Sequence, residues 1–481
     1  LPIIPYPNHV EFLGGEVAIT PEFPIISKNN DTIGSKEGYE LKITQSGIEI
    51  TAKSQAGHFY AEQTLKQLKR MNKTPCVVIK DEPAYEYRGF MLDSVRHMTA
   101  FDEVKKLIDA MALFKLNVFH WHLTDDQGWR IETDKWQNLT KIGSIRSASQ
   151  FGDINDMTEH GGYYTKNQLR EIVEYCAQRH ITVVPEFDLP GHTRSVLASY
   201  PELSCTGEKL NVPTRQGIYK DVLCLGNEKT FELVFDVLDG IIEIFPSKIV
   251  HIGGDEVPKS RWSKCPKCQS KMKQLGLKNE EELQGWFVQK VIDFLSLRGA
   301  SAILWNESLN SGKIKDKPIA QNWMDKKGVC VEYANNGGKL IISDFYHYYL
   351  DYPYAMTPLK KTFNYNPLIK GLTNEGKKNI LGVEAPIWTE HVRDFEKMGF
   401  MCYPRAAAVA QTGWTNPESK DLNTFYESFD SITPLLNEIG ITPAPKKEWD
   451  PHIFKRIIGT AKFFKGFVDF GSILNAIRND K

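Results

Sequence analysis

The pattern of apolar and polar positions divides the chain into two parts. In the first part, short alternating runs typical of strands occur at 17–20, 39–44 and 47–52. From Gly57 to Leu68 the apolar residues instead recur at the spacing of an amphipathic helix. Asp81-Glu82-Pro83 marks a boundary, because a proline cannot continue a helix and favours an extended linker. Residues 1–83 are therefore predicted to form a small α+β domain.

From residue 84 onward, short β-type runs alternate with long amphipathic stretches. Eight such runs occur, at 89–95, 117–126, 182–190, 248–256, 301–308, 318–325, 339–345 and 379–390. The alternation indicates a parallel sheet, because parallel strands need crossover connections. We expect a (β/α)8 TIM barrel over 84–445, with 446–481 as a helical tail packed on it. An open doubly wound sheet is the rival fold, although a G-x-G-x-x-G after the first strand and a P-loop are both missing from the sequence.

Polar and aromatic residues gather where these runs end. The ends carry Asp93, Arg96-His97, His120-Trp121-His122, Asp125-Asp126, Glu186 to His192, Asp255-Glu256, Trp305-Asn306-Glu307, Trp323, Tyr349 to Asp351, Trp388 and Glu390. In an α/β barrel the carboxyl ends of the strands meet at one face, which carries the catalytic groups. The sequence therefore predicts one site assembled from these residues.

Composition narrows the class of protein. Hydrophobic residues make up 41% and charged residues 25% of the 481 residues, as in an ordinary globular protein. Lys and Arg total 59 against 60 Asp and Glu, a balance that argues against a nucleic-acid binder or a polybasic membrane-surface protein. No apolar run reaches the roughly 18 residues of a membrane span. The first residues, Leu1-Pro2, lack a start Met, so we expect a trimmed product from which any signal peptide is gone.

Asp255-Glu256 is the pair most suited to acid–base chemistry. Two adjacent carboxyl groups in a semi-buried cleft repel each other, so their pKa values separate and one can stay protonated near neutral pH. The preceding Gly253-Gly254 permits close approach of the backbone at the strand end, which a solvated acidic turn would not need. Neighbours on a strand start on opposite faces, so they are poorly suited to grip one bond from two sides. Another group, such as one on the substrate itself, must then supply the nucleophile.

For other residues, both a purely structural role and a catalytic or binding role are open. His192 is a candidate relay between the acid and a second carboxylate such as Asp125, although a lone histidine is more often part of a core or a helix cap. His120 and His122 share one face of a strand and could bind a metal ion, but we favour two packed imidazoles. Tryptophans at separate strand ends suggest an aromatic pocket.

The cysteines pose a separate question. Cys265 and Cys268 form a C-x-x-C knuckle, which is half of a zinc site. Cys205 and Cys224 could supply the other half, or they could form a disulfide with each other. A four-thiolate zinc would be structural, because it leaves no open position for catalysis. We expect no cofactor for catalysis itself.

Four long motifs resemble one enzyme family. They are Arg88-Gly-Phe-Met-Leu-Asp93-Ser-Val-Arg96-His97, Asn117-Val-Phe-His-Trp-His-Leu-Thr-Asp125-Asp126, Pro185-Glu-Phe-Asp188-Leu-Pro-Gly-His192 and His251-Ile-Gly-Gly-Asp255-Glu256. In this order they are similar to glycoside hydrolase family 20, the β-N-acetylhexosaminidases, over nearly the whole chain. The resemblance implies an exo-acting enzyme that removes terminal β-linked GlcNAc or GalNAc from glycans. It also implies a retaining route in which the substrate's acetamido oxygen attacks the anomeric carbon to form an oxazolinium ion.

The resemblance also implies a role for each site residue. Glu256 matches the general acid/base, Asp255 the group that orients the acetamido N–H, and Tyr349 the hydroxyl that binds the acetamido oxygen. Asp125 and His192 match the relay behind the acid. The remaining matches concern sugar binding: Arg88 as a guanidinium fork on O3 and O4, Asp351 and Glu390 on the far hydroxyls, and Trp305, Trp323 and Trp388 as walls.

Two other hypotheses remain open at this point. One is a metal-dependent barrel hydrolase that uses His120 and His122, and the other is a catalytically dead glycan-binding protein. For the leading hypothesis the partner is a glycan with a terminal β-HexNAc, without nucleic acid and without a membrane span. Glycan substrates and the missing start Met favour export, to a bacterial periplasm or outside the cell.

Overall fold

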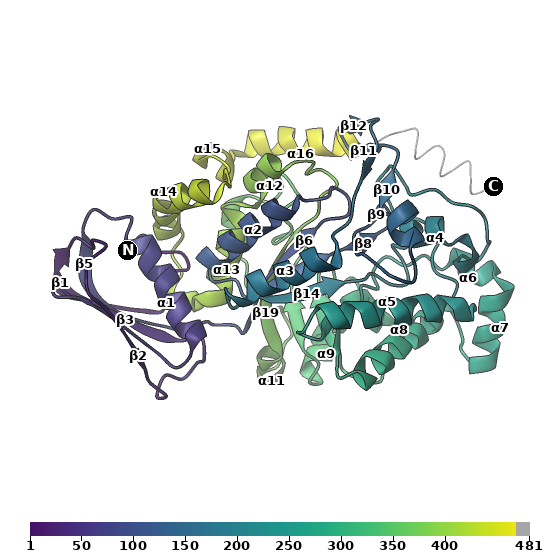
Figure 1. Cartoon of the computed structure of the whole chain (residues 1–481), viewed down its shortest axis with the longest axis horizontal. Helices are drawn as coiled ribbons and strands as arrows, with labels where there is room; N and C mark the ends of the chain where they lie inside the picture. The colour runs from purple at the N-terminus through teal and green to yellow at the C-terminus, as the bar shows by residue number, and fades with distance from the viewer. Residues whose placement is uncertain (468–481) are drawn as a thin grey trace.

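The structure is a computed structural model that describes residues 1–467, and it has a small part and a large part side by side (Figure 1). The small part is a five-stranded sheet with the spatial order β1-β5-β3-β4-β2. Its elements are β1 (His9–Val17), β2 (Ile25–Asn29), β3 (Tyr39–Ile43), β4 (Ile48–Ala52), α1 (Gln55–Leu68) and β5 (Thr74–Asp81). The strand expected at 17–20 is wrong, because β1 ends at Val17, four residues before Pro21. Ser54 caps α1 by accepting a hydrogen bond from the backbone N–H of Ala56.

The large part is a closed barrel of eight parallel strands, as predicted. The strands are β6 (Tyr87–Asp93), β7 (Val118–His122), β14 (Thr182–Glu186), β15 (Ile249–His251), β16 (Ser301–Trp305), β17 (Ile319–Asn322), β18 (Leu340–Ile342) and β19 (Ile380–Ile387). Each of the eight predicted runs contains or overlaps one of them. The rival open sheet is wrong, because β19 pairs with β6 from Gly382–Tyr87 to Ile387–Leu92 and so closes the ring.

Helices and short hairpins fill the connections between the strands. The helices are α2 (Phe101–Leu113), α3 (Lys166–Ala177), α4 (Arg194–Ser199), α5 (Glu228–Ile244), α6 (Ser260–Lys264), α7 (Pro266–Leu275), α8 (Glu280–Leu297), α9 (Val329–Asn335), α10 (Leu359–Phe363), α11 (Asn374–Lys378), α12 (Phe395–Cys402), α13 (Arg405–Trp414), α14 (Leu422–Ile439), α15 (Lys446–Trp449) and α16 (Ile453–Phe467). The hairpins pair β8 (Thr124–Asp125) with β9 (Gly128–Trp129), β10 (Ile145–Arg146) with β13 (His160–Gly161), and β11 (Ser149–Phe151) with β12 (Ile154–Asp156). In the described residues, no helix is both long and apolar enough to cross a membrane.

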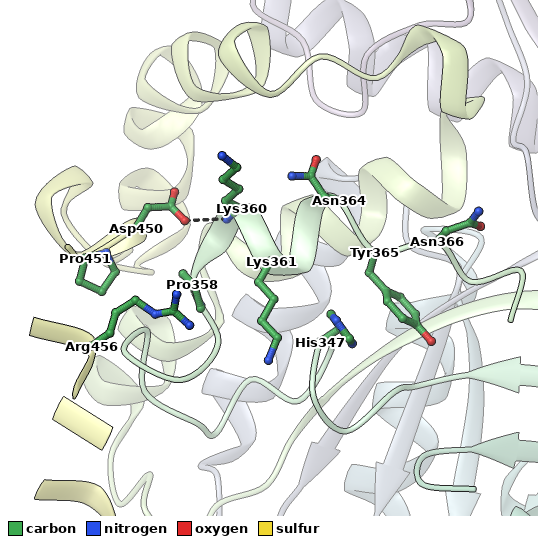
Figure 2. Close-up of a pocket in the computed structure, with 10 residues that line it drawn as sticks. All are labelled: His347, Pro358, Lys360, Lys361, Asn364, Tyr365, Asn366, Asp450, Pro451 and Arg456. Atoms are coloured by element: carbon green, nitrogen blue, oxygen red, sulfur yellow. Dashed lines mark hydrogen bonds between the residues drawn. The ribbon is translucent and has the colours of Figure 1, made fainter. Parts of the chain in front are cut away.

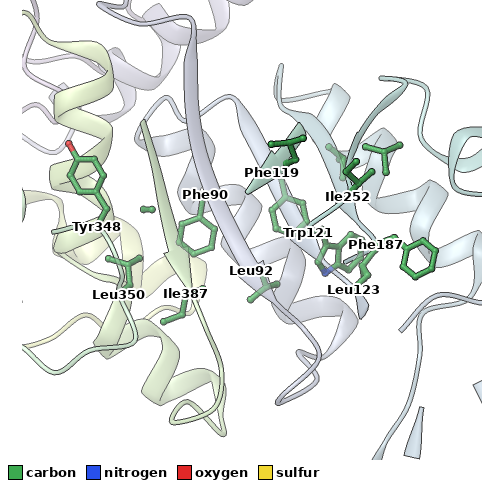
Figure 3. Packing of buried hydrophobic residues seen from close by; sticks show 14 of the residues in the cluster. Phe90, Leu92, Phe119, Trp121, Leu123, Phe187, Ile252, Tyr348, Leu350 and Ile387 are labelled. Carbon is green, nitrogen blue, oxygen red and sulfur yellow. The ribbon is translucent and has the colours of Figure 1, made fainter. Parts of the chain in front are cut away.

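The interior of the barrel is built in layers. One apolar residue from every strand forms the layer at the amino ends: Tyr87, Val118, Val184, Ile249, Ile303, Ile319, Ile341 and Leu381. Side chains of the opposite strand face pack outward against the helices, as Phe90, Leu92, Phe119 and Trp121 do in Figure 3. Because side chains alternate along a strand, the apolar plug and the outer core come from the same short runs. The plug leaves the carboxyl ends of the strands free for polar groups.

The tail after the barrel lies along its outer surface (Figure 1). Arg456 of α16 donates a hydrogen bond to the carbonyl of Ala355 at 3.1 Å, and the Phe463 ring lies 5.4 Å from that of Tyr352. The predicted tail reaches to residue 481, but 468–481 lie outside the described residues. The exact domain boundaries at 83 and 445 stay predictions.

Candidate active site

A cavity of about 310 Å³ opens at the carboxyl ends of the barrel strands. Its walls are Arg96, Asp125, Asp188, His192, Gln216, Gly217, Ile218, Asp255, Glu256, Trp323, Phe345, Tyr349, Asp351, Tyr352, Trp388, Glu390 and His391. A wider opening of about 780 Å³ lies on the outer side, between α10 and the start of α16 (Figure 2). Among its ten lining residues the one carboxyl group, Asp450, already accepts a hydrogen bond from the Lys360 backbone at 2.7 Å. The smaller cavity therefore has the chemistry of an active site.

The chain after β15 is bent so that both predicted catalytic carboxyl groups face this cavity. A Cβ atom on Gly253 would lie 1.7 Å from Oδ1 of Asp188, and one on Gly254 would lie 2.1 Å from Oγ of Ser308. Both positions therefore require glycine, as the sequence suggested. Glu256 itself has a φ of 48°, in the left-handed region that non-glycine residues rarely adopt. Such backbone strain at a pocket wall is typical of functional residues.

The environment of the two carboxyl groups favours their neutral forms. Burial raises the pKa of Asp255 to about 7, with a further rise from the nearby Glu256 and an opposing effect of His192. Burial also raises the pKa of Glu256, again opposed by His192 and supported by Glu307. The backbone N–H of Glu256 donates to Oε2 of Glu307 at 2.9 Å, which fixes the position of the acid. Glu256 can therefore hold a proton at a pH where an exposed glutamate would have lost it.

His192 connects these carboxyl groups to a buried acid. Its Nδ1 lies 3.2 Å from Oδ1 of Asp125, and its Nε2 lies 3.7 Å from Oε2 of Glu256 and 3.9 Å from Oδ2 of Asp255. Burial alone would lower the pKa of His192, but Asp125, Asp126 and Asp188 together outweigh burial and raise that pKa well above the ordinary value. The geometry places His192 where the relay hypothesis needs it.

His120 and His122 are engaged with buried carboxylates beneath the cavity. Nδ1 of His120 lies 2.9 Å from Oε1 of Glu384, and its Nε2 lies 3.1 Å from Oε2 of Glu186. His122 contacts the same Glu186 through Nδ1 and, through Nε2, Oδ2 of Asp125 at 2.9 Å. All of these side chains are fully buried. This pattern supports the packed interpretation of the two imidazoles over a pair that binds a metal ion together.

The predicted sugar-binding residues mostly line the cavity. Trp323 and Tyr349 are stacked with ring centroids 6.2 Å apart, and Trp388 stands 6.2 Å from Tyr349 on another side. Asp351 and Glu390 lie in the same cavity wall. Trp305 is not among the lining residues: it lies beneath them, 1% exposed, and its Nε1 donates to Oε1 of Glu186 at 2.9 Å. Trp305 thus supports Trp388, whose ring is 6.1 Å away.

The sequence-based assignment of Arg88 to the sugar is wrong. Arg88 is fully buried at the start of β6, the end opposite to the cavity, where its guanidinium binds Glu37 of the small domain at 2.7 and 3.0 Å. The guanidinium that reaches the cavity is that of Arg96, which follows β6. It lies 2.8 Å from Oδ2 of Asp125 and 3.6 Å from Oε1 of Glu390. The position of the strand could have revealed this, because only a residue after the run can lie at its carboxyl end.

Several lining residues were missed from the sequence. Phe345 and Tyr352 add aromatic rings on the side of Tyr349, with centroids 5.3 Å apart for Phe345 and Tyr349. Residues 216–218 reach the cavity from a long irregular connection between α4 and α5, which carries no periodic pattern that could place it. The four cysteines of the predicted knuckle are brought together, but none of them lines the cavity. Their thiols are free, so the predicted alternative of a Cys205–Cys224 disulfide is wrong.

Comparison with known proteins identifies the whole arrangement. The sequence profile "Glycosyl hydrolase family 20, catalytic domain" matches residues 85–417, and "Glycosyl hydrolase family 20, domain 2" matches 25–82. A β-hexosaminidase of Porphyromonas gingivalis is 38% identical over 437 residues, which cover 86% of this chain and 55% of that protein. A β-hexosaminidase of Akkermansia muciniphila is 34% identical over 431 residues, which cover 86% of this chain and 86% of that protein.

Solved structures agree with the sequence comparison. The crystal structure of a β-N-acetylhexosaminidase superposes with a TM-score of 0.86 and 31% identity, over 94% of this chain and 98% of that one. An exo-β-N-acetylglucosaminidase of Vibrio harveyi, solved in complex with N-acetylglucosamine, superposes with a TM-score of 0.83 and 30% identity. The match covers 92% of this chain and 78% of that one. The chain spans about half of the P. gingivalis protein but nearly all of the first of these structures. The chain therefore belongs to glycosyl hydrolase family 20, the family of the β-hexosaminidases, and contains its catalytic barrel and its domain 2.

Proposed function

We propose that the chain is an exo-acting β-N-acetylhexosaminidase that releases terminal β-linked GlcNAc or GalNAc from glycans. Enzymes of this family work by substrate-assisted catalysis with retention of configuration. The observation that carries the proposal is the adjacency of Asp255 and Glu256 in one cavity with His192 behind them. A small cavity of about 310 Å³ suits one terminal sugar better than an internal stretch of a polysaccharide.

Unpartnered polar atoms support a sugar as the occupant. Five buried atoms of cavity-lining residues have no hydrogen-bond partner: Nε1 of Trp323, Nε1 of Trp388, Oδ1 of Asp255, Oδ1 of Asp351 and Oε1 of Gln216. Buried polar groups are rarely left unpaired in native proteins, so these atoms are expected to bind a ligand. Two donors and three acceptors set among aromatic rings match a pyranose with several hydroxyls and an amide.

The chemistry assigned to the residues begins with Glu256. It donates its proton to the glycosidic oxygen as the bond to the anomeric carbon breaks. The acetamido oxygen of the same sugar attacks that carbon, which gives an oxazolinium ion. In its ionised form, Asp255 accepts a hydrogen bond from the acetamido N–H and stabilises the positive charge that develops there. Tyr349 donates its hydroxyl hydrogen to the acetamido oxygen and so holds it in line for attack.

The second half of the reaction reverses these roles. The Glu256 carboxylate takes a proton from a water molecule, and the water oxygen attacks the anomeric carbon and opens the ring of the oxazolinium ion. His192, held by Asp125, stabilises the negative charge on Glu256 between the two steps. Arg96, Asp351 and Glu390 are assigned to the hydroxyls on the far side of the sugar. Arg96 replaces Arg88 in this role.

The test compares hydrolysis of an aryl β-GlcNAc and the matching aryl β-glucoside. The two differ at the 2-substituent, so an enzyme whose substrate supplies the nucleophile cleaves the first and leaves the second intact. Comparable rates would mean that an enzyme carboxylate is the nucleophile, and would refute the mechanism. Binding of GlcNAc without cleavage of either substrate would instead favour a glycan-binding protein.

Glycan substrates of this kind also support the proposal that the protein acts after export, in a periplasm or outside the cell. Fractionation of the source cells with an antibody against the chain tests this location. Recovery of the protein with the cytosolic fraction would contradict it.

A further inference from the structure

Four cysteine thiols from three separate segments meet at one point on the rim of the barrel. They are Cys205, Cys224, Cys265 and Cys268, and all four sulfur atoms lie within 4.8 Å of one another. The sulfur–sulfur distances are 3.7 Å from Cys224 to Cys265, 3.7 Å from Cys224 to Cys268, and 3.9 Å from Cys205 to Cys268. A disulfide would need about 2.05 Å, so these are separate thiols.

Three of the six sulfur–sulfur separations match the edge of a tetrahedral metal site, and all six are within 4.8 Å. Zinc–thiolate bonds are about 2.3 Å long, so the sulfur atoms of a regular tetrahedron around zinc lie about 3.8 Å apart. The distances 3.7, 3.7 and 3.9 Å fall within about 0.1 Å of that edge length. A set of four thiolates has no open position, so the ion it holds is structural.

The backbone around the thiols is built for close approach. A Cβ atom on Gly226 would lie 2.2 Å from the carbonyl carbon of Lys267, so the turn after Cys224 packs directly on the C-x-x-C turn. Cys265 is the residue that caps α7, and Cys268 lies in the first turn of that helix, where the helix dipole favours thiolates. Three of the four cysteines are fully buried, and Cys205 is half-buried. Protein groups thus enclose the cluster on most sides.

The cluster joins the two chain segments that border the catalytic cavity. Cys205 and Cys224 close a long irregular loop, and the middle of that loop, residues 216–218, forms a wall of the cavity. Cys265 and Cys268 lie on the segment that continues from the catalytic strand end at Glu256. Loops longer than about 15 residues without regular structure seldom hold a fixed shape unless something ties them down. Gln150 already binds the Thr214 carbonyl, and Arg194 and Arg261 already pair with Asp221. A bridge at the cysteines would add a constraint at both ends of the loop.

We propose that the four cysteines bind one Zn²⁺ ion, which fixes the loop 206–223 against the start of α7 and so holds the 216–218 wall of the cavity in place. The metal takes no part in the reaction. The effect on catalysis rests on the proposed function, whereas metal binding and loop order do not.

Metal content of the full chain is the first experiment. Protein expressed with added zinc and purified without chelator is expected to hold about one zinc per chain by elemental mass spectrometry. The double variant Cys265→Ser/Cys268→Ser is expected to hold less than a tenth of that, while Cys176→Ser, a buried thiol of α3 outside the cluster, keeps it. Wild-type protein without zinc, or with iron in its place, would overturn the proposal. Replacement of zinc by Co²⁺ in the wild type should give the intense visible bands of a tetrahedral cobalt thiolate, and their absence would also overturn it.

Loop order is the second readout, because it does not depend on activity. Lys209, Arg215 and Lys220 place trypsin sites inside the loop. We expect cleavage there to be at least tenfold faster in the double variant than in the wild type or in Cys176→Ser. Equal cleavage rates in metal-bound wild type and metal-free variant would show that the ion does not hold the loop. If the zinc and the loop behave as proposed but aryl β-GlcNAc is not cleaved, the proposed function fails and the metal site stands.

Discussion

Replacement of Asp255 by asparagine should make the protein more stable at the same time as it removes activity. Asparagine has nearly the shape of the protonated acid but cannot ionise. In the folded wild type the pKa of Asp255 is raised to about 7, chiefly by burial, against 3.8 for the free side chain. Between those two pH values the folded state binds more protons than the unfolded state, so stability falls as the pH rises.

The size of the effect follows from the shift. A shift of about three pKa units, at about 1.4 kcal/mol each, corresponds to roughly 4 kcal/mol of folding stability. The wild type loses this stability as the pH rises from 3.8 to 7. The asparagine variant does not lose it. At pH 5 the wild type has lost only part of this stability. The free energy of unfolding of Asp255→Asn should therefore exceed that of the wild type by at most about 3 kcal/mol more at pH 8 than at pH 5. Below pH 3.8 the two proteins should be about equally stable.

Urea unfolding at pH 5 and pH 8 measures this difference directly, with Asp31→Asn, an exposed carboxyl group, as the matched control. The control should change stability by less than about 0.5 kcal/mol at either pH. The kcat of Asp255→Asn on aryl β-GlcNAc should fall by about 100-fold or more, the usual cost of losing one transition-state contact of this kind. An advantage that is equal at both pH values, or a variant that is less stable at pH 8, would refute the reasoning.

Three further predictions concern single side chains. Glu256→Gln should lower kcat on a phenyl β-GlcNAc by about 100-fold or more, but much less on a dinitrophenyl β-GlcNAc, because the dinitrophenolate leaves without a proton. Equal losses of kcat on the two substrates would contradict the role of Glu256 as acid. Arg96→Lys should chiefly raise KM for aryl β-GlcNAc, about tenfold, because the planar fork is lost. Arg88→Lys should instead lower the urea midpoint and leave KM unchanged; the reverse pattern in the two variants would restore Arg88 to the site.

The fold could be predicted because each strand of the barrel has its own recognisable apolar pattern in the sequence. Every strand is a short apolar run, and the helices between them repeat apolar residues at helical spacing. The small domain was harder to place. Its β1 is largely exposed, with Phe12 61% accessible and a bulge at Gly14 and Gly15, so no alternating pattern marks its length. Exposed strands leave the identity of their residues weakly constrained.

The site could be predicted where residues follow a strand directly, and less well elsewhere. Asp255, Glu256 and His192 line the cavity, and they could be placed there because motif and strand position agree. Trp305 was expected as a wall and instead lies one layer below, because a single position along β16 decides between lining the cavity and supporting it. Residues 216–218 come from a loop whose path depends on distant contacts, such as the bridge between Gln150 and Arg215. Local sequence carries no trace of such contacts.

The buried ion pairs between the two domains have a consequence for how this chain can be divided. Arg88 of the barrel binds Glu37, and Lys115 lies 3.1 Å from Asp81, with each basic side chain fully buried. Trp414 of α13 belongs to the hydrophobic cluster of the small domain, and its Nε1 donates to Asp81. A barrel separated from its first 83 residues would lose these partners and expose an apolar face together with two stranded cations. The small domain therefore cannot be exchanged freely between relatives. A chimaera should fold when the residues on both sides of this domain interface come from the same parent.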